Sequence, residues 1–429
     1  MSLGTSKKVL ILCYYWPPSG GSGVQRWMYF AKYLKQFGWE PIVITVDEKK
    51  AAYPTLDKSL LEEVKTIRVI KTTTREPLKL YSRLVSGSAN AGIPQGEVNT
   101  NSVFKKIAAY IRGNFFIPDA RKGWVPFAIK AAKRIIVEEK IQHLITTGPP
   151  HSCHLAGLAL KKEFPLNWWV DFRDPWTTVF YNQQMFRSKR SASKDQALEL
   201  AVLQAASGVI TTVGGELVQR LQKKVPHQRI EVLPNGFDAE LLATVQAEKK
   251  NDVFHLVYTG LLTQNQAYRE IISALKQVKK QRPIQFSLAG NISASIITEI
   301  QQALPEIEVT YHGYLEHAAA VGLMKRADLL LNFIFEGAQT EMISGKLLEY
   351  FATGVPVLCL GNPNSAAGEF IAQGSFARIF LPNQQEEIVA FLSECYKQQD
   401  TPFNAFSNLQ DWSRESISQQ LISKVLTLD

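Results

Sequence analysis

Three charged side chains that could bind a charged, hydroxyl-bearing ligand lie within nine residues: Glu341, Lys346 and Glu349. Ser344 and Gly345 stand just before the lysine and are typical of a helix start. Serine accepts hydrogen bonds from helix N–H groups, and glycine lets a ligand approach the backbone closely. The start of a helix beside a lysine is a ready site for an anion such as a diphosphate.

The two glutamates are expected to have separate tasks. Lys346 and Glu349 are three residues apart and share one side of the helix, where the carboxylate could accept hydrogen bonds from sugar hydroxyls. Glu341 is eight residues from Glu349, roughly 12 Å at about 1.5 Å per helical residue, so the two would lie at opposite ends of one elongated ligand. The alternative is an exposed helix with an i, i+3 ion pair, and the spacing alone does not decide between them.

The surrounding residues predict a helix followed by a buried strand. Apolar residues recur at helical spacing, Gly354 suits a left-handed helix end, and Pro356 stands just beyond it. The run from Val355 to Leu360 is apolar throughout, as in a parallel strand covered on both faces. The apolar helix positions are Leu347, Leu348, Phe351 and Ala352.

This stretch resembles the group 1 retaining glycosyltransferases of the GT-B fold. The resemblance rests on E-x7-E, on the lysine three residues before the second glutamate, and on the A-x-G-x-P-V that follows. The last motif is Ala352, Gly354, Pro356 and Val357. The resemblance implies that Lys346, with Ser344 and Gly345, contacts the diphosphate of a nucleotide sugar. It also implies that Glu349 binds the ribose and that Glu341 lies near the transferred sugar.

Four more loops fit the donor-binding pattern of that family. They read PNGFD at 234–238, YTG at 258–260, LAGN at 288–291 and YHGYL at 311–315. The resemblance implies that Gly260, His312, Gly313 and Tyr314 surround the ribose and base. Many members carry an arginine after the YTG glycine. Here Gln266 stands in that place, so either Arg269 replaces the arginine at the diphosphate or the second cation is missing.

The N-terminal half opens with a strand, a glycine-rich loop and a helix. The loop is not the G-x-G-x-x-G of NAD enzymes, and its glycines could simply make a tight turn. The resemblance implies that Gly21 faces the donor phosphate and Gly23 the acceptor. Arg26, in the first helical turn, is expected either to contact the acceptor or to be solvated.

Three further candidates follow later strands. His151 stands at the start of a predicted helix, where a neutral imidazole could bind a sugar hydroxyl, or it merely fills the loop. Arg173 and Asp174 open the motif RDPW, which resembles the R-D-x-W of a subset of the family. Asp174 is expected to act as a general base or to position the acceptor beside Arg173. Alternatively, it caps a helix that begins at Pro175.

Two successive series of strands and helices predict an α/β protein with two Rossmann-like doubly wound lobes facing across a cleft. The predicted divisions are an acceptor lobe at 1–238, a crossover at 239–252, a nucleotide-sugar lobe at 253–395 and a helical segment at 396–429 that returns to the first lobe. Residues 72–102 are polar and irregular and predict a loop over the acceptor.

Charge and composition suggest a location. The chain of 429 residues has a net charge of +9, with nine Lys or Arg against three Asp or Glu at 101–140. Residues 103–117 form a basic amphipathic segment suited either to an anionic membrane surface or to packing on the protein itself. No signal peptide or membrane span is recognised, and the four cysteines are far apart. We expect a cytoplasmic protein, or one peripheral to the inner face of the cell membrane.

The resemblance and the residues together predict transfer of a sugar from a nucleotide diphosphate sugar to a saccharide or lipid-linked acceptor, in cell-surface polysaccharide or glycolipid assembly. No D-x-D stands in a plausible donor position, so no metal is expected. No cofactor and no nucleic acid partner are expected either. The alternatives are a silent nucleotide-sugar-binding subunit, favoured by Gln266, or an epimerase, whose additional acid and base residues are not found.

Overall fold

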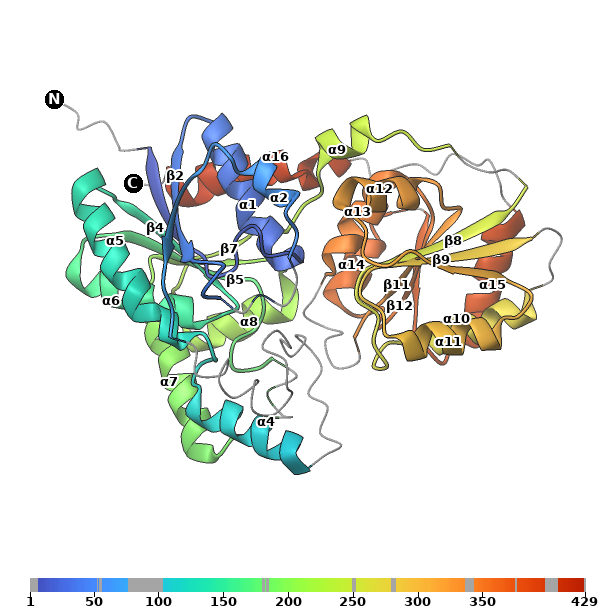
Figure 1. The fold of residues 1–429 in the computed structure, drawn as a ribbon, viewed down its shortest axis with the longest axis horizontal. Coiled ribbons are helices and arrows are strands. Elements are labelled where there is room, and N and C mark those ends of the chain that lie inside the picture. Colours follow the sequence, from blue (N-terminus) through green and yellow to red (C-terminus); the bar gives the residue numbers. More distant parts are fainter. Residues whose placement is uncertain are drawn as a thin grey trace. The chain divides into compact units, whose positions relative to one another are not determined.

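Figure 1 shows the fold in a computed structural model. It describes residues 7–51, 53, 56–75, 103–179, 182, 185–248, 252–278, 283–335, 343–374, 376–397 and 408–427. Glu341 and most of the predicted acceptor loop at 72–102 lie outside these ranges.

The chain divides into two compact units. In Figure 1, unit 1 runs from blue to green and includes the red C-terminal end, and unit 2 runs from yellow-green to orange-red. Unit 1 contains residues 1–234 and 418–429, and unit 2 contains residues 235–417. Helix α9 (Ala239–Thr244), inside the predicted 239–252 crossover, belongs to unit 2. Of the predicted returning segment 396–429, only residues 418–429 belong to unit 1.

Unit 1 is built on a parallel sheet of seven strands in the order β3-β2-β1-β4-β5-β6-β7. Residues Val9 to Leu12 of β1, an interior strand, are fully buried, as their continuous apolar run requires. The chain turns outward in both directions from β1, so the switch point lies between β1 and β4. The strands are β1 (Lys8–Leu12), β2 (Glu40–Val46), β3 (Arg68–Thr72), β4 (His143–Gly148), β5 (Asn167–Phe172), β6 (Gly208–Thr211) and β7 (Ile230–Val232).

The helices of unit 1 connect these strands, and α5 and α6 pack on each other as well as on the sheet. They are α1 (Ser22–Gln36), α2 (Leu60–Glu63), α4 (Val103–Phe115), α5 (Val125–Glu139), α6 (Ser152–Glu163), α7 (Lys189–Ala205) and α8 (Gly215–Lys224). A short 3₁₀ turn, η1 (Lys122–Trp124), precedes α5, and a π-helical turn, η4 (Ile422–Leu426), lies near the C-terminus.

Unit 2 repeats the plan with six parallel strands in the order β10-β9-β8-β11-β12-β13. The switch point lies between β8 and β11. The strands are β8 (Phe254–Thr259), β9 (Ile284–Ala289), β10 (Glu308–Tyr311), β11 (Leu329–Phe333), β12 (Val357–Leu360) and β13 (Ala377–Phe380).

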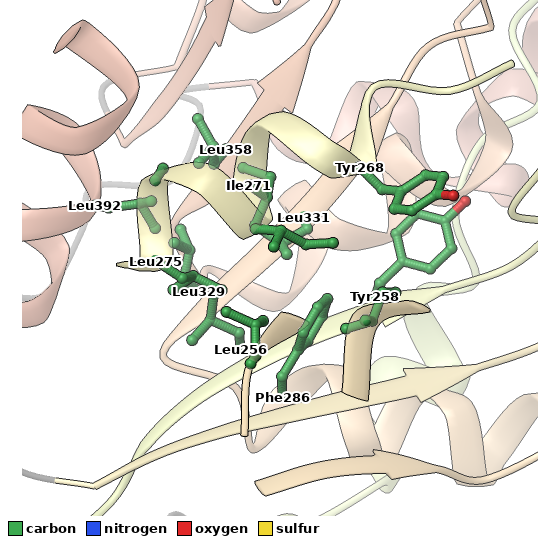
Figure 2. Close-up of a cluster of buried hydrophobic side chains, with 14 of the residues drawn as sticks. Leu256, Tyr258, Tyr268, Ile271, Leu275, Phe286, Leu329, Leu331, Leu358 and Leu392 are labelled. Atoms are coloured by element: carbon green, nitrogen blue, oxygen red, sulfur yellow. The ribbon is translucent and has the colours of Figure 1, made fainter. Parts of the chain in front are cut away.

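Two hydrophobic clusters cover the two faces of this sheet. Figure 2 shows one of them, where Ile271 and Leu275 of α10 pack over Leu329 and Leu331 of β11. Helices α11 and α15 join this face, whereas α12, α13 and α14 cover the other. Their bounds are α10 (Tyr268–Gln277), α11 (Ala294–Ala303), α12 (His317–Lys325), α13 (Gly345–Thr353), α14 (Ala366–Ile371) and α15 (Gln385–Lys397). A 3₁₀ turn, η3 (Leu409–Trp412), and α16 (Arg414–Leu421) follow.

The two doubly wound sheets confirm the predicted fold class. The structure excludes one alternative: no helix begins at Pro175, where the chain is irregular. Asp174 is therefore not a helix cap. Several elements that are short or lie near the edges of the sheets were not predicted from the sequence: α2, β3, α8, α9, α11, α14 and β13. Among the residues that the structure describes, no helix is long and apolar enough to cross a bilayer.

Candidate functional site

The start of α13 lies at the switch point of the unit 2 sheet. Ser344 occupies the N-cap with extended backbone angles, but its side chain makes no cap hydrogen bond. Its hydroxyl instead donates to Oδ1 of Asn332 on β11, at 3.1 Å. The first turn of the helix carries no acidic residue. The positive end of α13 is therefore uncapped by a side chain and suited to an anion.

Lys346 projects from this first turn onto the end of β8. Its Nζ donates to the hydroxyl of Tyr258 at 2.7 Å and lies over the Tyr258 ring, 4.1 Å from the centroid. A Cβ at Gly260 would meet Nζ at 2.9 Å, and Gly260 has a φ of +114°. Burial lowers the pKa of Lys346 to about 7. A desolvated lysine held by neutral partners is ready to pair with an incoming anion.

A row of glycines leads from Lys346 to the loop predicted to hold the base. Gly260, Gly290 and Gly313 end or follow β8, β9 and β10, and all three have positive φ. A Cβ at Gly290 would meet the carbonyl oxygen of Gly260 at 2.2 Å, and the Gly290 N–H donates to the Gly313 oxygen at 2.7 Å. His312 and the exposed Tyr314 flank the last glycine. The structure thus gathers Lys346, Gly260 and residues 312–314 along one edge of the sheet.

Glu349 lies one turn further along α13 in a network of its own. Its Oε1 accepts from Nε2 of His317 at 2.8 Å and from Nη2 of Arg414 at 3.3 Å. Burial alone would raise the pKa of Glu349, but the His317 hydrogen bond and the charges of His317 and Arg414 lower it. Because Lys346 turns to Tyr258 instead, the described residues do not contain the simple Lys346–Glu349 ion pair.

Arg269 does not lie beside Lys346, as one of the two alternatives for it required. Its guanidinium binds Glu299 on α11, with a 2.5 Å contact from Nε. Helices α10 and α11 cover the opposite face of the sheet from α13. Gln266 is also committed elsewhere, since it is buried and its amide donates to the Phe333 oxygen at 2.9 Å. Neither side chain joins Lys346.

In unit 1 the structure brings Gly23, Arg173 and Asp174 together at the carboxyl edge of the sheet. A Cβ at Gly23 would meet Nη1 of Arg173 at 2.1 Å, so only glycine lets the guanidinium lie on the start of α1. Nε of Arg173 is 3.5 Å from Oδ2 of Asp174, and both side chains are partly buried. Gly21 caps α1 with a φ of +100°.

Arg26 has a different place from the one expected. It is buried, and its Nη2 pairs with Oδ1 of Asp171 at 2.8 Å while Nη1 donates to the Leu233 oxygen. Trp27 and Thr147 donate to the other oxygen of Asp171. Arg26 is therefore neither solvated nor placed to contact an acceptor, because the core needs its charge to balance Asp171.

His151 lies in a buried aromatic group before α6. Its ring stacks on Trp176, with centroids 5.0 Å apart and an interplanar angle of 6°. Burial, followed by the charges of His154 and Arg173, holds its pKa well below the usual value and so favours the neutral imidazole. Both ring nitrogens are buried and lack hydrogen-bond partners among the described residues. His154 differs, since its Nδ1 bonds to Oγ1 of Thr146 at 2.8 Å.

Five contact residues escaped the sequence analysis: Tyr258, Asn332, His317, Arg414 and Trp176. Tyr258 and Trp176 stood inside motifs that had been noted, but nothing local indicated their partners. Arg414 is 65 residues from Glu349 and carries no motif. Within the described ranges, no group of three or more His, Cys, Asp or Glu side chains could hold a metal ion.

Residues 253–398 match the family described as Glycosyl transferases group 1. This match covers the strands of unit 2, the glycine row and α13, and for that segment it confirms the group 1 part of the resemblance. A comparison with curated proteins found no match.

Several solved structures share the fold of nearly the whole chain. HepE of Anabaena in complex with UDP and glucose has a TM-score of 0.62 at 14% identity, covering 98% of this chain and 100% of that one. Sucrose-phosphate synthase of Thermosynechococcus elongatus has a TM-score of 0.64 at 14% identity, with 97% and 98% covered. WaaG, a glycosyltransferase involved in lipopolysaccharide biosynthesis, has a TM-score of 0.54 at 14% identity, with 98% and 96% covered. The chain has the GT-B fold.

Proposed function

We propose that the protein is a retaining glycosyltransferase that moves a hexosyl or related sugar from a nucleotide diphosphate sugar to an acceptor hydroxyl. The observation that carries this proposal is Lys346 at the uncapped start of α13, packed on Gly260. An ammonium and helix N–H groups together stabilise the charge that develops on a departing diphosphate. We propose that they do so without a metal ion.

The glycine row supports an extended donor along the edge of the unit 2 sheet. The diphosphate would bind at Lys346, Ser344 and Gly345. The base would lie at Gly313, at the other end of the glycine row. Glu349 would accept hydrogen bonds from the ribose. UDP is the nucleotide to test first, because the HepE structures contain UDP and UDP-glucose.

The proposed transfer breaks one bond to the anomeric carbon and forms another. The bond between the anomeric carbon and the diphosphate oxygen breaks, the acceptor oxygen bonds to that carbon on the same face, and the acceptor proton passes to a base. We assign Asp174 to the base or to the positioning of the acceptor, with Arg173 and Gly23 beside it. His151 is assigned to a sugar hydroxyl, Glu341 to the transferred sugar, and Gly21 to the donor phosphate.

Calorimetric titration of the full chain with UDP, GDP and ADP tests the proposal. We expect one nucleotide to bind in the presence of EDTA. Lys346→Ala should lower the affinity for that nucleotide at least tenfold, because it removes a charge-assisted contact. Lys276→Ala, at an exposed position of α10, is the matched control and should bind as the wild type does. Failure of every nucleotide to bind would contradict the proposal.

The silent-subunit alternative makes a different prediction with the same reagents. A subunit without activity would bind the nucleotide but neither hydrolyse the nucleotide sugar nor transfer its sugar to any acceptor. Release of UDP from UDP-sugars, followed with a panel of saccharide and lipid-linked acceptors, separates the two. The expected acceptors are those of cell-surface polysaccharide or glycolipid assembly.

We also propose that α4 places the protein on an anionic membrane surface, at the inner face of the cell membrane. Ile107, Tyr110 and Phe115 are 49%, 48% and 66% exposed, whereas Ala109 is buried. Gly113 faces inward too, because a Cβ there would meet the Met185 oxygen at 2.4 Å. The helix therefore packs through Ala109 and Gly113 and turns Ile107, Tyr110 and Phe115 outward, in a strongly basic part of the chain.

A further inference from the structure

Arg414 lies between two carboxylates of unit 2. Its Nη2 is 3.3 Å from Oε1 of Glu349, and its Nη1 is 3.8 Å from Oδ2 of Asp238. The Arg414 and Asp238 side chains are each 7% exposed, and that of Glu349 is 12% exposed. Ion pairs that are this well shielded from water hold their geometry far better than surface pairs do.

The backbone around Arg414 is fixed by pairing with residues far away in sequence. The Phe237 N–H donates to the Trp412 oxygen at 3.2 Å, and the Arg414 N–H donates to the Phe237 oxygen at 2.9 Å. Gly236 makes this close approach possible, since a Cβ there would meet the Arg414 nitrogen and the Trp412 oxygen at 3.0 Å each. The guanidinium is therefore anchored at its base as well as at its tip.

Asp238 is itself held in place. Its Oδ1 accepts from the Leu241 N–H at 3.0 Å and caps α9. Its other oxygen faces Arg414. The carboxylate of Asp238 thus pairs with Nη1 of the guanidinium, while Nη2 is directed at Glu349.

Both donors to Glu349 reach the same oxygen. His317 and Arg414 bond to Oε1, and no donor in the described part of the chain reaches Oε2. A carboxylate held by one oxygen has the other in a fixed direction for accepting hydrogen bonds. Vicinal hydroxyls, such as those of a ribose, are the ligands that such an acceptor selects.

We infer that Arg414 is a positioning residue for nucleoside recognition, which orients Glu349 through the chain Asp238–Arg414–Glu349 so that Oε2 receives the ribose hydroxyls. The inference rests on the proposed function, in which Glu349 binds the ribose of the donor. It assigns to residues 412–417 a part in nucleotide recognition, although they lie outside the 253–398 segment that matches the family.

The test compares UDP with 2′,3′-dideoxy-UDP, because a merely structural role for Arg414 would not change the ratio of their affinities. The wild type should prefer UDP by roughly tenfold or more, the value of hydrogen bonds to a charged acceptor. Arg414→Gln should reduce that preference to about threefold or less, while the affinity for the dideoxy nucleotide stays nearly constant. Arg414→Lys should show a preference between that of Arg414→Gln and that of the wild type. Lysine keeps the positive charge, but one ammonium cannot bridge both carboxylates as a guanidinium does.

Two further variants keep the test decisive. Glu349→Gln should lose the preference as Arg414→Gln does, and the double variant should lose no more, because the two residues act in one chain. Arg378→Gln, on β13, is the matched control and should keep the full preference. An unchanged preference in folded Arg414→Gln and Arg414→Lys proteins would overturn the inference and leave the proposed function standing. Failure of the wild type to bind any nucleotide would overturn both.

Discussion

The ammonium of Lys346 donates to the Tyr258 hydroxyl at 2.7 Å and lies 4.1 Å from the centre of the same ring. The tyrosine hydroxyl donates its own proton to the Leu261 oxygen. Its oxygen therefore acts as the acceptor for the lysine. The lysine is therefore held at the end of β8 by a neutral group. A neutral partner keeps the lysine in place without cancelling its charge.

The low pKa of Lys346 predicts a pH dependence of nucleotide binding. Its pKa is lowered to about 7 by burial, so the cation that pairs with a diphosphate is lost as the pH rises above that value. UDP affinity should fall roughly tenfold or more between about pH 7 and pH 8.5, while the charge of the nucleotide, with a second phosphate pKa of about 6, stays constant.

Titration calorimetry in buffers of different ionisation enthalpy checks this directly, because proton uptake by the wild type should accompany binding at pH 8. Lys346→Ala should bind weakly with no dependence on pH in this range. A pH profile shared by both proteins would assign the titration to another group.

Gly260→Ala should abolish UDP binding. The new methyl group would meet Nζ of Lys346 at 2.9 Å. In addition, a φ of +114° suits only glycine, and an alanine held there would destabilise the fold by at least about 1 kcal/mol. Gly322→Ala in α12 is the control, because its Cβ would find the nearest atom at 3.6 Å. That variant should bind normally and be as stable as the wild type or more so, as measured by thermal unfolding.

Arg269→Ala should leave UDP affinity unchanged, because its guanidinium is paired with Glu299 on α11. Gln266→Ala should instead lower the stability of unit 2, since it removes the buried bond to the Phe333 oxygen. Calorimetry and thermal unfolding of the two variants distinguish these effects. A tenfold loss of affinity in Arg269→Ala would return that residue to the diphosphate site.

Asp171→Asn should destabilise the protein by about 3–5 kcal/mol, the usual effect of leaving a buried arginine without its carboxylate. Arg26 and Asp171 have fully buried side chains, and Trp27 donates to the same carboxylate. Urea unfolding followed by tryptophan fluorescence measures the loss. Glu62→Gln, which removes an exposed pair with Lys65, should have no measurable effect. Equal stability of the two variants would contradict this account of Arg26.

Phe115→Ser should reduce binding to vesicles that contain anionic lipid. Phe115 and Val137 are both 66% exposed, but only Phe115 belongs to α4, so Val137→Ser is the control. Cosedimentation with anionic and neutral vesicles measures the difference, and added salt should weaken the binding. Equal binding of the two variants would remove α4 from the membrane surface.

The sequence predicted the local parts of this fold well because their signals are local. A strand of continuous apolar residues, a Ser before a helix and a Gly after it are each read within a few positions, and α13 ends at Gly354 with a φ of +71° as expected. The alternation of such elements is enough to predict two doubly wound sheets. The N-cap alternative for Asp174 was not settled by the sequence, because Asp-Pro is compatible with an irregular turn as well as with a helix.

The partners of each charged side chain were decided by the tertiary structure alone. Lys346 lies 88 positions from Tyr258, Arg26 lies 145 from Asp171, and Arg414 lies 65 from Glu349. Strand order brings these pairs together, and burial then requires each charge or polar group to find a partner. By itself, then, the sequence determined most of the central strands and their helices, the fold class and the candidate residues at the start of α13. Which cations remained for a ligand, and which were used to hold the core, depended on contacts that no local pattern encodes.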